Sequence, residues 1–336
     1  MTIIYALIIF CLLIFVHELG HFIVAKACGV KVNEFAIGMG PAIFSRQKGE
    51  TKYSIRIFPI GGYCAMEGED EDSDEPRALN NQPAWQRACI LAAGSVMNFI
   101  TCVVLLIIIA FWMGTATTTI DQVSDGSPAE RAGIVSGDTI VSIDGQKIEE
   151  WDELIQAIGY SKEETAQITV DRNGTQQTMT TDLEYDKEAG RNLIGVTPVM
   201  EHSFINSIGG GIRNTGSMTV MMYTVLKQLF TGEVSVKELS GPVGIVYATS
   251  EAAKSGIMYV IYLAALLSLN LAIINMLPFP ALDGGRLLFL VIRLFTGRRV
   301  SDETEGKIHF IGICLLFALM IYVTFNDVIR FIIPIF

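Results

Sequence analysis

Two histidines and a glutamate lie together in one apolar segment near the start of the chain. The segment His17-Glu18-Leu19-Gly20-His21 has the HExxH spacing, and residues four apart on a helix share one face. Both imidazoles can therefore reach one metal ion, and neutral imidazoles suit zinc. Glu18 can face the same ion without binding it, which leaves its carboxylate free to take a proton from an attacking water. The spacing predicts metal-assisted hydrolysis.

The position of this motif argues against a chance match. It follows residues 1–16, which include no charged side chain. An ionisable group inside a transmembrane helix costs at least ~2.5–3.5 kcal/mol on insertion scales, so Glu18 needs a functional reason to be there. Two rival interpretations are a membrane scaffold with a structural metal and a metal transporter that uses the histidines as transit ligands. A structural site has no need of Glu18, and a transporter needs more polar residues along its helices.

Two histidines do not complete a catalytic zinc site, which normally uses three protein ligands and a water. The other two histidines are poor candidates. His202 is expected on the outer side of the membrane, and His309 starts the last apolar run. Asp283 ends the uncharged run 255–282, at an inferred depth that matches that of the HExxH motif. Two prolines within 275–285 break the helix and free backbone groups near the metal. We expect Asp283 to be the third ligand; a simple helix terminator is the alternative.

Four apolar stretches can each cross a membrane as a helix, which takes about 20 residues. They cover residues 1–25 around the HExxH motif, 88–120, 255–282 and 308–326. The chain is 51% hydrophobic and 18% charged, whereas soluble proteins carry about 25% charged residues. The first stretch has no basic residue before Lys26 and no small-residue cleavage site, so we expect a retained helix and not a signal peptide.

Basic residues predict the orientation of these helices. Residues 26–87 include eight Lys or Arg and residues 284–307 include five, and cytoplasmic loops are enriched in such residues. Residues 114–200 hold 16 acidic and 6 basic side chains, nearly all of the net charge of −11. This segment is therefore expected outside, with both termini, and a nucleic-acid partner is not expected. The six cysteines form no CxxC pair and fit small apolar positions in helices.

The segments between the apolar stretches have their own patterns. Lys52–Phe58 alternates like a strand, 42–46 can pair with it through a turn at Lys48-Gly49, and residues 59–63 are expected to end it. This hairpin is so apolar that we expect it to dip toward the membrane, with a surface hairpin as the alternative. Between the second and third helices, short β-rich runs such as 139–143 and a helix over 151–158 indicate one small domain. An interfacial helix is also expected within 202–231.

The motifs resemble those of the site-2 protease family of intramembrane metalloproteases. The HELGH segment is followed by Phe35–Pro41, and Asn275–Gly285 matches the family's N-x-x-P-x-P-x-L-D-G segment. Residues Gly126–Asp138, running into Asp144-Gly145, resemble a bacterial PDZ domain. One such domain between the second and third helices is similar to the RseP-type branch.

The resemblance implies a polytopic α-helical membrane protein of the bacterial cell membrane, with about four transmembrane helices and a membrane-associated β-hairpin. A single extracytoplasmic PDZ domain of the α+β class would be inserted between two membrane halves. The expected parts are residues 1–114, with the HExxH motif and the hairpin, the PDZ domain at 115–200, and residues 201–336, with the third ligand.

The resemblance also implies roles for single residues. One zinc ion would be held by His17, His21 and Asp283, with Glu18 as the catalytic base near the cytoplasmic side. Asn275 would orient the substrate backbone or stabilise the oxyanion, and a strand at Gly61, Gly62 and Tyr63 would pair with an extended substrate. Gly94 and Asn98 match a G-x-x-x-N pattern of the family's second helix, for which close helix packing is an equally good explanation.

The expected activity is regulated intramembrane proteolysis. The substrate would be the transmembrane segment of a single-pass membrane protein, for example an anti-sigma factor or a signal-peptide remnant. The PDZ domain would select or exclude substrates through their ectodomain or a new C-terminus.

Overall fold

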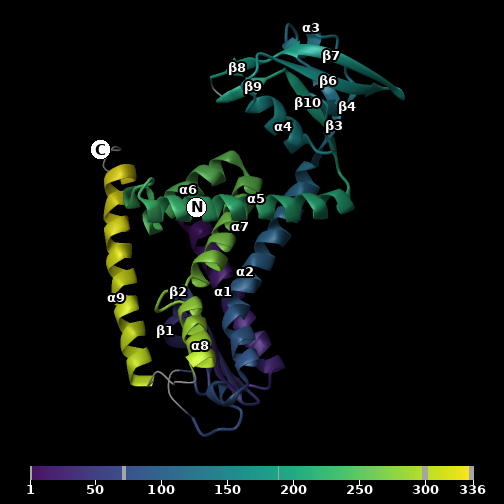
Figure 1. The fold of residues 1–336 in the computed structure, drawn as a ribbon. Helices are drawn as coiled ribbons and strands as arrows, with labels where there is room; N and C mark the ends of the chain where they lie inside the picture. Colours follow the sequence, from purple (N-terminus) through teal and green to yellow (C-terminus); the bar gives the residue numbers. More distant parts are fainter. Residues whose placement is uncertain (1, 70–72, 188, 297–301, 333–336) are drawn as a thin grey trace. The chain divides into compact units, whose positions relative to one another are not determined.

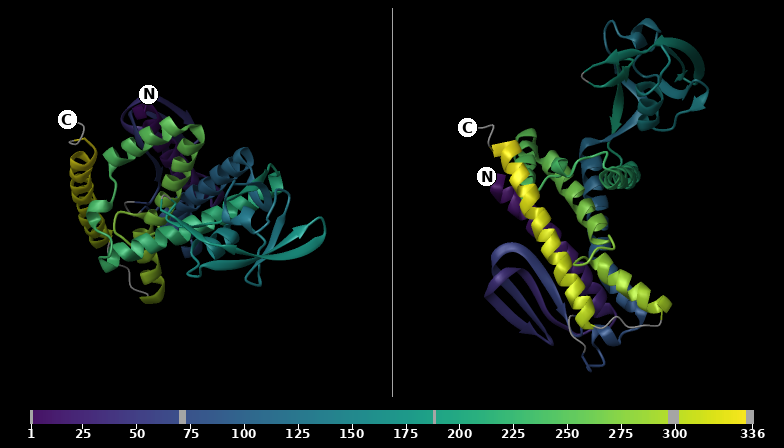
Figure 2. Two further views of the ribbon diagram at one scale, coloured as in Figure 1. Left: turned by 90° about the horizontal axis from the view of Figure 1, so that it is seen from above. Right: turned by 60° about the vertical axis from the view of Figure 1, so that its left-hand side comes forward.

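The computed structural model describes residues 2–69, 73–187, 189–296 and 302–332 (Figures 1 and 2). The chain divides into two compact units. One, the helical unit, combines residues 1–106 and 211–336, and the other, the insert, covers residues 107–210. The segment expected to form a separate domain, residues 115–200, lies within the insert.

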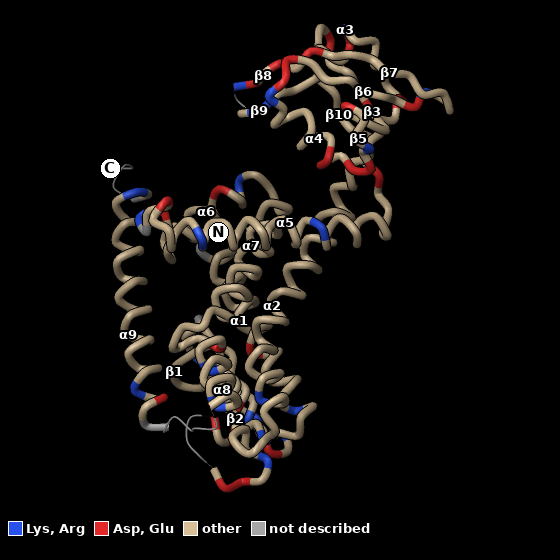
Figure 3. The backbone as a smooth tube through the Cα atoms, in the orientation of Figure 1, with Lys and Arg blue, Asp and Glu red and all other residues tan. Residues whose placement is uncertain are grey.

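Within the described residues, four helices are long and apolar enough to cross a membrane, as the sequence predicted. They are α1 (Thr2–Ala27), α2 (Ala84–Met113), α7 (Ile257–Asn275) and α9 (Asp302–Asp327), which continues into a π-helical turn, η3 (Val328–Ile332). Much of their apolar surface faces outward; on α9 alone, the exposed side chains include Phe310, Ile311, Leu315, Phe317 and Ile321. Charged residues of the helical unit gather toward the ends of these helices (Figure 3). This surface requires a lipid environment.

Two of the predicted apolar runs are longer than their helices. The uncharged run 88–120 is longer than its helix, because α2 ends at Met113 and a strand begins at Thr115. Gly114, with a φ of +84°, makes the break, and the threonines that follow it are β-branched and favour extended backbone. The run 255–282 contributes only α7, which begins after Gly256.

The helical unit also holds shorter elements between the spanning helices. They are η1 (Leu79–Asn81), η2 (Val236–Glu238), α6 (Pro242–Ser255) and α8 (Asp283–Thr296), whereas α5 (Phe204–Thr231) links it to the insert. The backbone N–H groups of Gly241 and Gly244 donate to the buried Asp327 carboxylate at 2.9 and 2.8 Å. The end of α9 therefore caps the start of α6.

The hairpin of the helical unit is longer than predicted. Strands β1 (Val32–Lys48) and β2 (Thr51–Met66) meet at a turn at Gly49. The predicted pairing is confirmed, since Ala42 pairs with Arg56. The predicted end of the strand at 59–63 is wrong: β2 bends at Gly61, with a φ of +87°, and continues to Met66. A proline and a glycine bend this strand without ending it.

After the bend, β2 folds back along the start of β1. Residues 34–37 of β1 pair with residues 52–55 on one side and with residues 62–65 on the other. The last part of β2 is therefore an edge of this small sheet. Figure 2 shows the sheet beside α1, against which β2 packs.

The insert is an α+β unit with its own core. Its six-stranded sheet has the order β10-β3-β4-β6-β7, with β5 paired to β4. The strands are β3 (Thr115–Val123), β4 (Thr139–Ile143), β5 (Gln146–Lys147), β6 (Thr165–Arg172), β7 (Thr175–Asp182) and β10 (Val196–Glu201); β8 (Glu184–Asp186) pairs with β9 (Arg191–Leu193). Helices α3 (Pro128–Arg131) and α4 (Trp151–Gly159) complete it, so the strand at 139–143 and the helix at 151–158 are confirmed. Isoleucines such as Ile140 and Ile168 are fully buried between these elements.

Candidate metal centre

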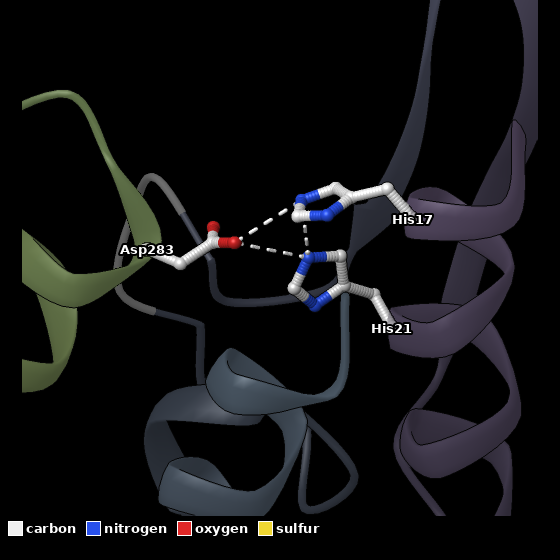
Figure 4. Close-up of side chains that lie close together, drawn as sticks. All are labelled: His17, His21 and Asp283. Carbon is white, nitrogen blue, oxygen red and sulfur yellow. Dashed lines mark hydrogen bonds and ion pairs between the residues drawn. The ribbon is translucent and has the colours of Figure 1, made fainter. Parts of the chain in front are cut away.

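Three side chains from two distant helices converge on one point (Figure 4). His17 and His21 lie one turn apart on α1, and their Nε2 atoms are 3.2 Å apart. Asp283 is the first residue of α8, and its Oδ2 atom lies 3.1 Å from the Nε2 of His17 and 3.4 Å from that of His21. The structure thus brings together the three residues that the sequence singled out as ligands.

These residues fit a zinc ion. Ligand bonds of about 2.0–2.2 Å in a tetrahedral site place the ligand atoms about 3.3–3.6 Å apart, close to the separations of 3.1–3.4 Å found here. Two imidazoles and one carboxylate are a donor set used by catalytic zinc sites. The buried Oδ2 of Asp283 makes no hydrogen bond within the described residues, so a cation would supply its missing partner.

Contacts from α2 orient both imidazole rings. His21 Nδ1 lies 2.8 Å from the backbone oxygen of Ile90, which fixes the proton on Nδ1 and leaves Nε2 to face the metal. His17 Nδ1 lies 3.3 Å from the side-chain nitrogen of Asn98, whose Oδ1 is buried without a donor among the described residues. The nitrogen and oxygen of an amide side chain are assigned from the hydrogen-bond network. With these two atoms of Asn98 exchanged, Oδ1 accepts a hydrogen bond from Nδ1–H of His17. Both rings then present Nε2 to one ion.

Gly94 gives the two rings room against α2. A Cβ at this position would lie 2.4 Å from His21 Nε2 and 2.6 Å from His17 Cε1. Gly94 and Asn98 are one helical turn apart, so the same face of α2 accommodates both rings and contacts that of His17. The metal centre itself therefore accounts for the G-x-x-x-N spacing, which the sequence left open between helix packing and a family motif.

The turn that carries Asp283 is tightly folded. A Cβ on Gly284 would lie 2.3 Å from the carbonyl oxygen of Leu277, so a larger residue does not fit there. Ala281 has a φ of +79°, and its N–H donates to Nδ1 of His309 on α9 at 2.9 Å. His309, rejected as a ligand from the sequence, thus supports the turn that precedes Asp283. Sequence spacing could not reveal this contact.

A cleft of about 260 Å³ opens beside two of the ligands, His17 and Asp283, and Glu18 and Asn275 also line it. The side-chain nitrogen of Asn275 lies 3.5 Å from His17 Nε2. Gly62, on the edge part of β2, faces the same region, because a Cβ there would lie 3.6 Å from Cγ of Glu18. A carboxylate and an amide therefore line the cleft, and the strand edge at Gly62 lies close to Glu18.

The other two hairpin residues singled out from the sequence contact different groups. The hydroxyl of Tyr63 is bonded to the Arg56 guanidinium, which also pairs with Glu34 at 2.8 Å. Burial raises the pKa of Glu34, but hydrogen bonds, led by those from Ser54 and Arg56, outweigh it and lower the pKa to about 2. Gly61 faces Met39 across the bend. Of the three hairpin residues, Gly62 is thus the one placed next to Glu18.

Comparisons with known proteins agree with this geometry. The profile described as Peptidase family M50 matches residues 5–319. The chain belongs to this family, the site-2 proteases. A relative in Clostridium acetobutylicum is 40% identical over 98% of this chain and 97% of its own. The zinc metalloprotease RasP of Geobacillus kaustophilus is 34% identical, and the regulator of sigma-W protease RasP of Bacillus subtilis 32% identical, each over 98% of both chains.

The chain is therefore a zinc-dependent intramembrane protease, as its sequence motifs predicted. Part of the chain also resembles a crystal structure of the PDZ domain of the SdrC-like protein from Listeria monocytogenes. That match is 28% identical, covers 26% of this chain and 87% of the other, and has a TM-score of 0.22.

Proposed function

We propose that His17, His21 and Asp283 bind the catalytic zinc and that Glu18 is the general base for peptide hydrolysis within a membrane. The observation that carries this proposal is the convergence of the three ligand atoms at 3.1–3.4 Å, with Glu18 lining the adjoining cleft. When bound, zinc polarises the scissile carbonyl and makes a water nucleophilic at neutral pH.

The residues around the ion have separate tasks in this mechanism. The Glu18 carboxylate takes a proton from the attacking water and returns it to the leaving nitrogen, which breaks the peptide bond. The side-chain amide of Asn275, in the same cleft, donates to the substrate carbonyl oxygen as negative charge develops on it. Glu18 has no need to bind the metal, because the two histidines and Asp283 supply the three usual protein ligands.

The substrate is the transmembrane segment of a single-pass membrane protein, in regulated intramembrane proteolysis. Helical carbonyls are hydrogen-bonded and shielded, so such a segment must unwind before cleavage. The edge of β2 at Gly62 supports this step, since an extended chain can add to a sheet edge as a further strand. Gly62 keeps the space in front of Glu18 open, with no side chain of its own. Anti-sigma factors and signal-peptide remnants are substrates of this kind.

The hairpin lies at the membrane. Both of its strands carry exposed large apolar side chains: Ile43 is 67%, Phe44 59% and Phe58 58% exposed. A solvated hairpin of this size would normally cover such a surface. Immersion of these side chains in lipid would bring the strand edge to the depth of a transmembrane substrate.

The insert acts as a PDZ-type peptide-binding domain, outside the cytoplasm, and the basic loops of the helical unit lie inside. A groove of about 310 Å³ runs between α4 and residues 191–198. Leu154 and Ile158 give it an apolar wall, and Arg191 supplies a positive charge for a terminal carboxylate. This groove fits the apolar C-terminus of a substrate shortened on its outer side.

The test is the Glu18→Gln variant of the full chain, in detergent, with a labelled transmembrane substrate. We expect zinc content to stay at the wild-type level and cleavage to stop, because glutamine occupies the same space and takes up no proton. Preserved cleavage would overturn the role of Glu18, and loss of zinc would make Glu18 a ligand. Removal of zinc by a chelator should stop cleavage in the wild type, and added zinc should restore it. Cleavage that resists chelation would contradict the mechanism.

A further inference from the structure

An ion pair joins the helix that carries Asp283 to the end of the hairpin. Arg286 Nη1 on α8 donates to Glu69 Oε1, between segments that are 217 residues apart in the chain. Arg286 lies three residues after Asp283, on the same side of α8. The other oxygen of Glu69 accepts from the backbone N–H of Met66, the last residue of β2, at 3.2 Å.

The Glu69–Arg286 pair can fix the position of α8 relative to the hairpin. The side chains of Glu69 and Arg286 are only 19% and 31% exposed, so water screens their attraction less than it would at an open surface. A charge-assisted bond between guanidinium and carboxylate is directional as well as strong. Gly284 and Gly285, between Asp283 and Arg286, lie close against the backbone of residues 276–280, so a displacement of Arg286 is passed on to Asp283.

We propose that Glu69 and Arg286 are a positioning pair that holds Asp283 opposite His17 and His21. The same pair ties the ligand to β2, whose edge at Gly62 lies beside Glu18. The positions of the third ligand, Asp283, and of the strand edge at Gly62 are thus fixed relative to each other. This proposal rests on the proposed function for its purpose, but it concerns zinc binding, which can be measured without a substrate.

The experiment is a charge exchange, read out as the zinc dissociation constant of the full-length protein in detergent, measured by chelator competition. Contacts that orient metal ligands are typically worth 10–100-fold in metal affinity. We expect Glu69→Arg and Arg286→Glu each to weaken zinc binding by about 10–100-fold. The double variant restores an opposite-charge pair and should recover most of the loss.

The signs of the effects separate positioning from long-range electrostatics. Glu69→Arg adds positive charge near the cation and Arg286→Glu adds negative charge, so electrostatics alone would shift the two affinities in opposite directions. Positioning weakens both. Asp74→Arg, at the acidic residue five positions after Glu69, and Arg293→Glu, on the same helix as Arg286, are the matched controls. Both should change the zinc affinity little.

Two outcomes would overturn the proposal. One is wild-type zinc affinity in both single variants, and the other is a double variant as weak as the two single losses combined. The first outcome, combined with a lower melting temperature of the zinc-free protein, would mean that the pair serves only overall stability. Failure of the proposed function is a separate result, because cleavage by Glu18→Gln would leave these affinities unaffected.

Discussion

Asp283 Oδ2 lies 3.1 Å from His17 Nε2, although the two residues belong to the eighth and first helices of the chain. The metal centre is therefore complete only when α1, α2 and α8 have packed. Zinc binding in this protein consequently reports on helix packing as well as on the ligands. Residues that set the spacing between these helices should affect zinc affinity even where they never touch the ion.

Gly94→Ala should strongly weaken zinc binding. The added methyl group would lie 2.4 Å from His21 Nε2, a distance that forces the ring or the helix to move. We expect a loss of zinc affinity of at least about 100-fold, the upper end for disturbed ligand orientation. Zinc content after dialysis measures it. Gly216→Ala on α5 is the control, because no described atom lies within 4 Å of its Cβ position. Equal zinc content in both variants would contradict the expectation.

Asn98 should act on zinc through His17. If its amide oxygen accepts the proton of His17 Nδ1, Asn98→Leu removes that acceptor at similar volume, and zinc affinity should fall about 10–100-fold. Asn98→Asp keeps an acceptor oxygen and should stay near the wild type. Chelator competition compares the two. The control is Ser268→Ala, which removes a 2.8 Å bond to the Asn98 backbone oxygen and leaves the side chain intact. Equal weakening in Leu and Asp variants would exclude an acceptor role.

The sequence predicted the parts of the site that depend on local spacing. HExxH places two imidazoles on one helix face, and an uncharged run ending in Asp283 marks both a helix and a carboxylate. Asp283 could be paired with the distant histidines because its inferred depth matched theirs, but other contacts between distant segments, such as Glu69 with Arg286 or Ala281 with His309, gave no such signal. Those depend on how helices pack, which no local pattern encodes.

The wrong end predicted for β2 has a physical origin. Pro59 and Gly61 lower the local strand preference, so the sequence suggested an end to β2 there. In the structure, the start of β1 offers partners to the following residues, and these backbone hydrogen bonds outweigh the local preference. An uncharged run also does not separate a helix from an apolar strand, so the run 88–120 covers both α2 and the start of β3.

The exposed apolar side chains of the hairpin should contact lipid. Ile43 is 67% exposed, and we expect a bimane label on Ile43→Cys to be quenched by brominated lipids. The variant is made after replacement of the six native cysteines, and the protein is reconstituted in vesicles. The same label on Asp74→Cys, in the charged loop after the hairpin, should be quenched by aqueous iodide instead. Iodide quenching at both positions, with no effect of brominated lipid, would place the hairpin in water.

The insert should lose stability on acidification through one buried carboxylate. Asp138 is fully buried and accepts from Arg172 Nε and Nη2, each at 2.7 Å, and from the Val135 N–H at 2.9 Å. The Arg172 bond, helped by the Val135 bond, outweighs burial and holds the pKa of Asp138 below its ordinary value of 3.8. A lowered pKa stabilises the folded form above the unfolded pKa, and this contribution is lost as the pH falls through the folded pKa.

Asp138→Asn should therefore destabilise the insert by about 3 kcal/mol at pH 7, the cost of breaking a buried pair. The difference from the wild type should shrink as the pH falls below about 3.8, the ordinary pKa of an aspartate. Denaturant unfolding followed by Trp151 fluorescence measures it in the full chain, with Trp85→Phe and Trp112→Phe to isolate the signal. Asp182→Asn, an exposed position on β7, is the matched control and should change the free energy of unfolding little. A pH-independent difference would show that the carboxylate charge contributes nothing and that the loss comes from packing alone.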